Sequence, residues 1–269
     1  MHPEAPARGD CVTRHHPRKR FGQNFLVDES VIAAIVTAVG PQPRDLMVEI
    51  GPGLGALTRP LSARVERLHV IEIDRDIVAR LRTIYAEERV TIHEGDALKF
   101  DFAALGAGLR VVGNLPYNIS TPLLFHLAES ASAIRDIHVM LQKEVVERMV
   151  AAPSSADYGR LSVMLQYRFE MERIITVPAA AFRPAPKVES AVARMVPFAR
   201  LPHPARDEAW FGKIVAAAFA QRRKTLRNAL RNYFRGEDFS RLGVDAGLRA
   251  QDLRIADFVR LADDAMQSA

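Results

Sequence analysis

Short apolar runs alternate with amphipathic segments over the first two thirds of the chain. The segments between the runs, such as GALTRPLSARV and DIVARLRTIYAEE, repeat their apolar positions with the period of a helix. Strands that are apolar almost throughout and are joined by helices are typical of a parallel sheet covered on both faces. The pattern therefore predicts an α/β fold with strands at five runs: LMVEI (46–50), LHVIEI (68–73), VTIH (90–93), LRVVG (109–113) and IHVML (137–141).

The pattern changes in the last third of the chain. Two longer β-like runs, LSVMLQYRFEMERIITV and VESAVARMVPF, are followed by PFARLPHPARDE, whose prolines indicate a linker. From Trp210 onward the period is helical and no strand signal remains. We therefore predict a disordered basic tail over residues 1–18, a sheet domain over 19–199 and a small helical domain over 200–269.

Composition is that of a globular protein, with 48% hydrophobic and 26% charged residues. Apolar runs such as VIAAIVTAV are shorter than the roughly 20 residues of a membrane span, and the N-terminus has no apolar segment typical of a secretory signal. The single cysteine, Cys11, excludes an intrachain disulfide and a cysteine metal cluster. It favours a reducing compartment, and we expect a cytoplasmic protein without a membrane partner.

Three glycines in VEIGPGLGALT lie between a predicted strand and a predicted helix: Gly51, Gly53 and Gly55. Glycines there allow a sharp turn and the close approach of a ligand, although they can also form only a tight turn. The next strand ends in Glu72, about twenty residues later, where a carboxylate can accept hydrogen bonds from ribose hydroxyls. The combination predicts a nucleoside cofactor and does not separate a dinucleotide from S-adenosylmethionine.

The third and fourth strands bring further polar groups to the same edge. Asp96 follows the third strand, where it could accept the exocyclic amine of an adenine or simply cap the segment ALKF. The fourth strand is followed by NLPYNIS. Because the carboxyl ends of parallel strands meet at one edge of a sheet, three such features are hard to explain as independent caps.

The segment NLPY has the groups needed to bind an aromatic amine. The amide oxygen of Asn114 and the carbonyl of Leu115 or Pro116 could accept both hydrogens of an amino group, and Tyr117 offers a stacking face. Such acceptors bend the amine towards tetrahedral geometry and return its lone pair to nitrogen, ready to attack a sulfonium methyl group. This chemistry needs no metal and no general base. An ordinary turn is the alternative interpretation.

Seven segments together resemble the signatures of the small-subunit (16S-type) ribosomal RNA adenine N6,N6-dimethyltransferases, in order and spacing, from Lys19 to the C-terminal region: GQNFLVD, EIGPGLGALT, IEID, GDAL, NLPYNIS, FRPAPKVESAV and FAQRRKTLRNAL. The resemblance implies a Rossmann-like, seven-stranded class I methyltransferase sheet with a small all-helical C-terminal domain. It implies S-adenosyl-L-methionine as the methyl donor and two adjacent adenines near the 3′ end of 16S rRNA as the substrate. A role in ribosome biogenesis, on a pre-ribosomal particle and as a monomer, follows from it.

The resemblance also assigns roles to individual residues. Asn24 and Leu26 are expected to form a lid over the cofactor, and Gly51 is expected to line its methionine moiety. Gly53 is a further expected cofactor-binding residue. Glu72 is expected to bind the ribose, Asp96 the adenine amine, and Asn114 is expected to lie between cofactor and target. Phe182 of FRPAPKV is expected to stack on the target base opposite Tyr117, although a buried phenylalanine in a proline-rich connector is nearly as consistent with the sequence.

The net charge of +5 is not spread evenly along the chain. The segment QRRKTLRNALRNYFR contains six Lys or Arg residues and no acidic residue. At helical spacing, one stripe is basic (Arg223, Arg227, Arg231 and Arg235) and another is apolar (Leu226, Leu230 and Phe234). We expect the apolar stripe to dock the helix and the basic one to bind RNA phosphates, with contacts from Arg222, Arg223, Lys224, Arg227 and Arg231. A solvated face is the alternative, and HHPRKR in the tail is a second candidate.

Three other functions are compatible with parts of the sequence. A dimethylase of 23S-type rRNA would share the fold and mechanism, but such enzymes typically have NIPY where this chain has NLPY. A Rossmann dehydrogenase fits GPGLG and Glu72 and gives no role to NLPY. A ribosome-assembly factor that has lost methylation is disfavoured, because every motif residue is present.

Overall fold

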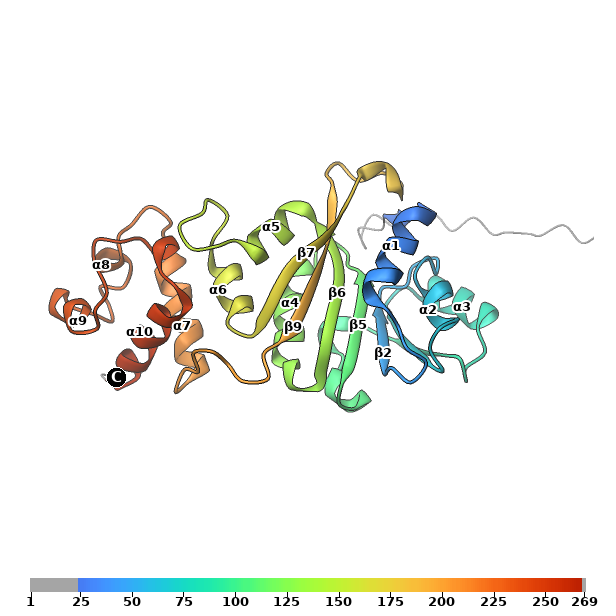
Figure 1. Cartoon of the computed structure of the whole chain (residues 1–269), viewed down its shortest axis with the longest axis horizontal. Helices are drawn as coiled ribbons and strands as arrows, with labels where there is room; N and C mark the ends of the chain where they lie inside the picture. Colours follow the sequence, from blue (N-terminus) through green and yellow to red (C-terminus); the bar gives the residue numbers. More distant parts are fainter. Residues whose placement is uncertain (1–23, 268–269) are drawn as a thin grey trace, which may run out of the picture.

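A computed structural model describes residues 24–267 of the chain (Figure 1). The predicted tail over residues 1–18, which includes Cys11, and the whole of HHPRKR (15–20) lie outside the described residues. Seven strands form one sheet in the order β4-β3-β2-β5-β6-β9-β7. The predicted α/β class and the seven-stranded sheet are therefore confirmed.

Five neighbouring strands of this sheet are parallel, and β9 runs antiparallel to both β6 and β7. All five strands predicted from apolar runs are present within a few residues of the expected positions. The strands are β2 (Met47–Ile50), β3 (Leu68–Glu72), β4 (Val90–Glu94), β5 (Leu109–Asn114), β6 (Ile134–Gln142), β7 (Phe169–Val177) and β9 (Ser190–Pro197).

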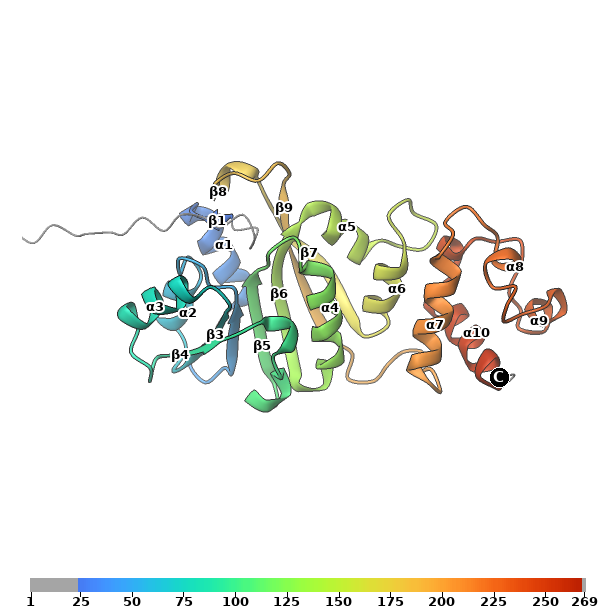
Figure 2. The same ribbon diagram turned by 180° about the vertical axis from the view of Figure 1, so that it is seen from behind.

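Helices cover both faces of the sheet (Figures 1 and 2). One apolar core packs α1 (Glu29–Val39), α2 (Thr58–Ser62) and α3 (Arg75–Ile84) against the first face. A second core packs α4 (Ser120–Glu129), α5 (Lys143–Val150) and α6 (Arg160–Gln166) against the other. Because both faces are covered, the central strands carry apolar residues at successive positions, which is the pattern found in the sequence.

Helix α1 shows how local sequence sets an element in place. The Asp28 carboxylate caps its start by accepting hydrogen bonds from the Ser30 and Val31 backbone, and Gly40 ends it in a left-handed conformation. At its C-terminal end the buried Arg110 guanidinium of β5 donates to the backbone oxygens of Val39 and Gly40. Helix α1 is thereby fixed to the sheet directly after the segment that contains Asn24 and Leu26.

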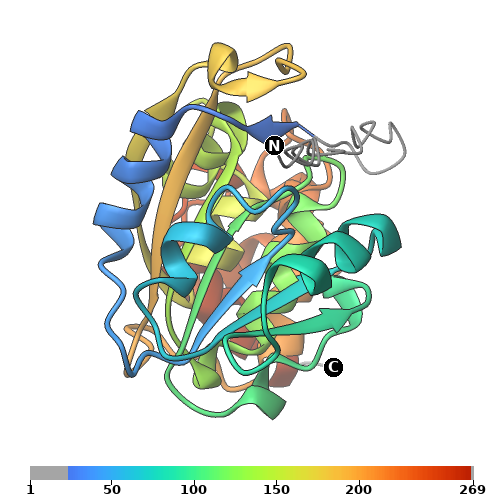
Figure 3. The ribbon, with the colours of Figure 1, turned by 90° about the vertical axis from the view of Figure 1, so that its right-hand side faces the viewer.

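A separate two-stranded ribbon joins two distant parts of the chain. Strand β1 (Phe25–Leu26) pairs antiparallel with β8 (Phe182–Arg183). Figure 3 shows this ribbon above the sheet, with α1 running down one side. The ribbon brings the QNFL and FRPAPKV segments together, although more than 150 residues separate them.

After β9 the described chain forms helices and turns. A third apolar core joins α7 (Glu208–Phe219), α8 (Leu226–Ala229), α9 (Gly236–Arg241) and α10 (Ile255–Gln267). This core also contains Tyr158, Val163 and Tyr167, which come from α6 and its flanking residues. The helical part is thus continuous with α6, and the boundary at residue 200 stays a prediction. No helix within residues 24–267 is long and apolar enough to cross a membrane.

The β-like interpretation of LSVMLQ is wrong, because these residues belong to α6. Val163 of this helix enters the core of the C-terminal helices, and Leu165 enters the core beside α4. A helix buried on two sides has no broad polar face, so its short apolar run cannot be distinguished from a strand by period.

The predicted continuous basic helix is also wrong in its extent. Helix α8 covers only four residues, and Thr225 before it is extended and forms an isolated bridge with Arg249. The backbone N–H groups of Leu226 and Arg227 donate to the carbonyl oxygens of Leu248 and Ala246. Residues 246–249 therefore hold this segment in place. The apolar half of the prediction is confirmed, because Leu226, Leu230 and Phe234 are buried.

Strands β2 and β5 approach each other closely at the edge where they end. In the parallel register Ile50 lies opposite Gly113. A Cβ atom at position 113 would lie 2.6 Å from the Ile50 carbonyl oxygen, which is far inside van der Waals contact. Only glycine fits here without separation of the two strands.

We expect Gly113→Ala to lower the free energy of unfolding by about 2–3 kcal/mol, the range of an overpacked core position. Denaturant unfolding of the purified variants measures this. Gly159→Ala is the matched control, because no atom lies within 4 Å of a Cβ there and the backbone is extended; it should cost at most about 1 kcal/mol. Equal losses in the two variants would contradict the close approach.

Candidate functional site

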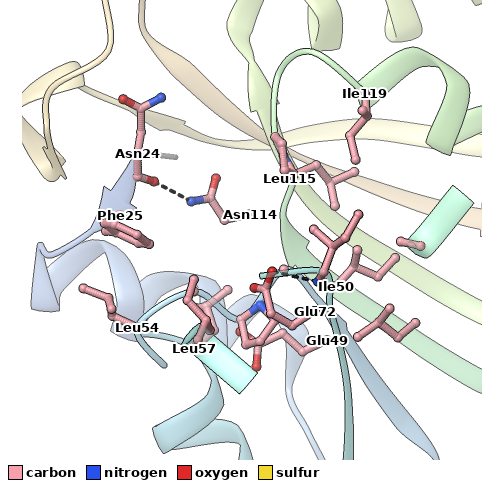
Figure 4. Close-up of a pocket in the computed structure, with 18 of the residues that line it drawn as sticks. Asn24, Phe25, Glu49, Ile50, Leu54, Leu57, Glu72, Asn114, Leu115 and Ile119 are labelled. Atoms are coloured by element: carbon pink, nitrogen blue, oxygen red, sulfur yellow. Dashed lines mark hydrogen bonds between the residues drawn. The ribbon is translucent and has the colours of Figure 1, made fainter. Parts of the chain in front are cut away.

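A cavity lies at the carboxyl ends of β2, β3, β4 and β5 (Figure 4). This is the edge at which open α/β sheets bind ligands. All but one of the predicted cofactor and catalytic residues line it: Asn24, Leu26, Gly51, Gly53, Glu72, Asp96, Asn114, Leu115, Pro116 and Tyr117.

The glycine loop after β2 forms one wall of the cavity. Gly51 and Gly53 have φ values of 66° and 54°, a left-handed conformation that favours glycine. A Cβ atom on Gly53 would lie 3.1 Å from the Phe25 ring, and one on Gly51 would lie 3.6 Å from the Asn114 carbonyl oxygen. The loop therefore fits closely between the β1 ribbon and the NLPY segment.

Glu72 connects the end of β3 to this loop. Its side chain is only 7% exposed, and its Oε1 atom accepts hydrogen bonds from the backbone N–H groups of Ile73 and Asp74, both at 2.9 Å. Burial raises the pKa of Glu72, while backbone hydrogen bonds from Asp74, Ile73 and Gly53 oppose that shift. The carboxyl group is thus held in a fixed orientation at the cavity wall.

Asp96 both caps a helical turn and faces the cavity. Its Oδ1 atom accepts a hydrogen bond of 2.9 Å from the Leu98 backbone at the start of the short 3₁₀ helix Ala97–Lys99. The capping role considered from the sequence is therefore present. The other oxygen, Oδ2, accepts no hydrogen bond from the described residues and is available to a ligand.

Hydrogen bonding in the NLPY segment distinguishes its acceptors. The Asn114 side-chain Nδ2 donates to the Asn24 backbone oxygen at 3.1 Å, so the amide oxygen is the atom left to accept (Figure 4). The Pro116 carbonyl already accepts from the Ile119 N–H and the Ser120 hydroxyl. The Leu115 carbonyl accepts no hydrogen bond within the described part of the chain. The sequence suggested the carbonyl group of Leu115 or of Pro116 as the second acceptor, and of these two the Leu115 carbonyl is the one left to accept a hydrogen bond.

Phe182 does not line the cavity. Its side chain is fully buried, because the pairing of β8 with β1 turns it into the apolar core that contains Leu26 and Val36. The prediction that Phe182 stacks on a target base is wrong for this arrangement of the chain. A buried phenylalanine in a proline-rich connector, the alternative, is what the structure contains.

The cavity also contains residues that were not predicted from the sequence. The strongest case is Glu49, which is 1% exposed and accepts a hydrogen bond of 2.7 Å from the Thr58 hydroxyl. Burial is the main cause that raises the pKa of Glu49 to about 8, with a further contribution from Glu72. A charged residue inside an apolar strand was the available signal. Leu54 and Ile73 are exposed apolar residues on the lining, where they offer contacts to a flat ring.

The lining is acidic in its titratable side chains. Among the described residues it contains the carboxyl groups of Glu49, Glu72 and Asp96, and no Lys, Arg or His. Such a lining suits a ligand that has positive charge and hydroxyl or amino donors.

Comparisons with known proteins agree with this geometry. The family model described as ribosomal RNA adenine dimethylase matches residues 14–267. A protein from Thiobacillus denitrificans named Ribosomal RNA small subunit methyltransferase A is 64% identical over 244 residues, covering 91% of this chain and 96% of that protein. A protein of the same name from Aromatoleum aromaticum is 62% identical over 252 residues, covering 94% and 95%.

Two solved structures have the same fold over most of their length. A dimethyladenosine transferase from Plasmodium falciparum has a TM-score of 0.73 at 24% identity and covers 88% of this chain and 95% of its own. The 23S rRNA methyltransferase ErmE has a TM-score of 0.70 at 26% identity and covers 91% and 100%.

The buried Glu49 predicts a pH dependence of stability. Its pKa is near 4.5 when unfolded and about 8 when folded, so the folded protein keeps a proton that the unfolded chain releases between these values. The contribution to stability is fully present below about pH 4.5 and is lost as the pH rises to about 8, with a slope of up to about 1.4 kcal/mol per pH unit.

We expect Glu49→Gln to lack this slope, since the amide is neutral at every pH. Its free energy of unfolding relative to the wild type should rise from about pH 5 to about pH 9, as measured by denaturant unfolding. Glu87→Gln, at an exposed position, is the control and should follow the wild-type curve. A difference between Glu49→Gln and wild type that stays constant with pH would show that Glu49 does not titrate in this range.

Proposed function

The chain belongs to the ribosomal RNA adenine dimethylase family, and we propose that it transfers methyl groups from S-adenosyl-L-methionine to N6 of two adjacent adenines near the 3′ end of 16S rRNA. The product is a pair of N6,N6-dimethyladenosines. The observation that carries the proposal is the placement of two free acceptors, Asn114 Oδ1 and the Leu115 carbonyl, on the wall of an acidic cavity.

The residues of the cavity fit the proposed cofactor. When bound, S-adenosyl-L-methionine supplies a methyl group on a positively charged sulfur. The carboxyl groups of the lining favour that charge. Glu72 would accept the ribose hydroxyls, and Asp96 Oδ2 would accept the adenine amine. Asn24, Leu26, Gly51 and Gly53 would enclose the methionine moiety.

Catalysis rests on the orientation of the target amine. Asn114 Oδ1 and the Leu115 carbonyl accept the two N6 hydrogens of the adenine, which localises the nitrogen lone pair and aims it into the cavity. Pro116 restricts the backbone that carries these acceptors, and the Tyr117 ring stacks on the base. S-adenosyl-L-methionine would supply the methyl group as its carbon–sulfur bond breaks, and N6 would then release one proton to water. The monomethylated amine keeps one N–H, so in the second transfer it would donate to only one of the two acceptors.

The choice of 16S over 23S rRNA rests on the relatives. The proteins named Ribosomal RNA small subunit methyltransferase A are 57–64% identical to this chain, whereas the 23S rRNA methyltransferase is 26% identical. The chain also has NLPY where the 23S-type enzymes typically have NIPY. We place the protein in ribosome biogenesis, acting in the cytoplasm as a monomer on a pre-ribosomal particle.

A basic surface on the C-terminal helices is proposed to bind the rRNA phosphates. We define it as the exposed side chains of Arg222, Arg223, Lys224, Arg227 and Arg231. Arg222 donates to the Ala156 carbonyl oxygen, so it also holds the loop between α5 and α6. The segment is anchored by the buried Leu226 and Leu230, which leaves the cations facing outward.

The direct test is methylation in vitro. The purified protein, small-subunit rRNA particles from cells that lack it and S-adenosyl-L-methionine should give dimethyladenosine in the 3′ region of 16S rRNA by mass spectrometry. Methylation of 23S rRNA in a parallel reaction but not of these particles, or no product in either reaction with bound cofactor, would refute the proposed substrate.

We expect Asn114→Ala to lower methyl transfer by about a hundredfold or more, the scale on which one transition-state electrostatic partner acts. Cofactor affinity by calorimetry should stay within a few-fold, since Glu72 and Asp96 are unchanged in this variant. Asn118→Ala, on the same loop, is the matched control and should change transfer less than about threefold. Equal losses of cofactor binding and turnover in Asn114→Ala would instead place Asn114 in the donor site.

Changing Arg223, Arg227 and Arg231 together to Gln should weaken RNA binding and reduce its dependence on salt. Removal of each phosphate contact should lower the slope of log affinity against log salt by about 0.7–0.9. Single-turnover transfer at saturating RNA should stay near the wild-type rate, because phosphate contacts position the substrate without touching the amine.

The matched control changes Arg44, Arg64 and Arg67 together to Gln and so removes the same number of positive charges. These three exposed residues precede β2 and β3, at the edge of the sheet opposite to the cavity. It should leave the salt slope unchanged. An unchanged slope in the first triple variant would show that the basic surface is only solvated.

A further inference from the structure

Ser190 is a buried polar residue to which the mechanism above gives no role. It is the first residue of β9 and is fully buried. Because β9 runs antiparallel to its neighbours, its first residue lies at the edge where the parallel strands end. There it pairs with Gln142 of β6 and Val177 of β7, so its backbone is held from both sides.

The Ser190 side chain reaches the NLPY segment. Its hydroxyl shares a hydrogen bond of 2.6 Å with the phenol of Tyr117, from 73 residues earlier in the chain. Within the described residues the Ser190 hydroxyl has no other hydrogen-bond partner. The bond therefore attaches the tip of the Tyr117 ring to a rigid position in the sheet.

The Tyr117 backbone is held by a different residue. The Ser120 hydroxyl, at the start of α4, lies within hydrogen-bonding distance of the Pro116 and Tyr117 carbonyl oxygens. Two serines thus restrain the two ends of one residue: Ser120 the main chain, and Ser190 the end of the side chain. With both ends fixed, the direction of the side chain, which χ1 sets, is held in one place. The backbone contact alone leaves the half-buried ring free to swing about χ1.

We propose that Ser190 is a positioning residue that fixes the χ1 angle of Tyr117, and so the place of its ring, for stacking on the target adenine. The inference rests on the proposed function, since the stacked base is the one whose amine Asn114 and Leu115 orient. A ring held in one place keeps the stacked base in one position, and therefore keeps N6 at the acceptors. The expected contribution is that of one neutral hydrogen bond, about a three- to tenfold change in rate.

A double-mutant cycle with Ser190→Ala, Tyr117→Phe and the double variant tests this. Tyr117→Phe keeps the aromatic ring, and Ser190→Ala keeps a small side chain, so each removes only the hydroxyl group. Ser190→Ala and Tyr117→Phe should each lower kcat by about three- to tenfold with little change in the KM for RNA. The double variant should be no slower than the slower single variant, because both remove the same bond. Cofactor affinity should be unchanged in all three.

Ser120→Ala is the matched control, because it removes a neighbouring serine hydroxyl that does not touch the Tyr117 phenol. The fold-change in kcat that Ser120→Ala causes should be the same in the wild-type background and in the Tyr117→Phe background. The proposal is overturned if Ser190→Ala has the wild-type kcat. It is also overturned if Ser190→Ala lowers kcat by the same factor in the Tyr117→Phe background, because that is the result expected from a general loss of stability.

A second measurement needs no catalytic activity, so it separates this inference from the proposed function. The protein has five tyrosines, and 3-fluorotyrosine labelling gives each a ¹⁹F resonance, with that of Tyr117 identified by its absence in Tyr117→Phe. Ser190→Ala should shift or broaden this resonance and leave the other four in place. An unchanged Tyr117 resonance would refute the inference even in an active enzyme, whereas failure of the wild type to methylate RNA would refute only the proposed function.

Discussion

The contact between the Ile50 carbonyl and the α-carbon of Gly113 sets the geometry on which the site depends. It allows β2 and β5 to lie side by side in parallel register up to their last residues. Gly51 and Asn114 therefore leave the sheet next to each other. The glycine loop that begins at Gly51 and the NLPY segment that begins at Asn114 are more than 60 residues apart in sequence, and this single close approach aligns them.

The ribbon of β1 and β8 closes the other side of the cavity. Phe25 and Leu26 of the ribbon line the cavity, and the residue directly before them contributes through its main chain, because the Asn24 carbonyl accepts the Asn114 side-chain amide. That bond decides which end of the amide is free to accept. The buried Leu26 and Phe182 hold the ribbon in place, so a motif residue such as Phe182, which does not line the cavity, still determines the orientation of a group that does.

The parts of the fold that could be predicted from sequence are those encoded by local pattern. Continuous apolar runs identified the five parallel strands, and polar residues at strand ends identified Glu72, Asp96 and Asn114. The errors fall where a distant partner decides the outcome. Helix α6 is buried between two cores, and residues 225–227 bond to the 246–249 segment in place of continuing a helix. Phe182 is turned inward by pairing with a strand near the other end of the chain.

Helix α6 contributes one side to the sheet core and the other to the core of the C-terminal helices. A rigid element shared by two cores prevents one part from rotating independently of the other. The shared helix therefore sets the distance between the cavity and the basic surface. Under the proposed function, an adenine would reach the acceptors only when the phosphates around it match that distance, so the fold would select RNAs by their three-dimensional shape as well as by the base presented.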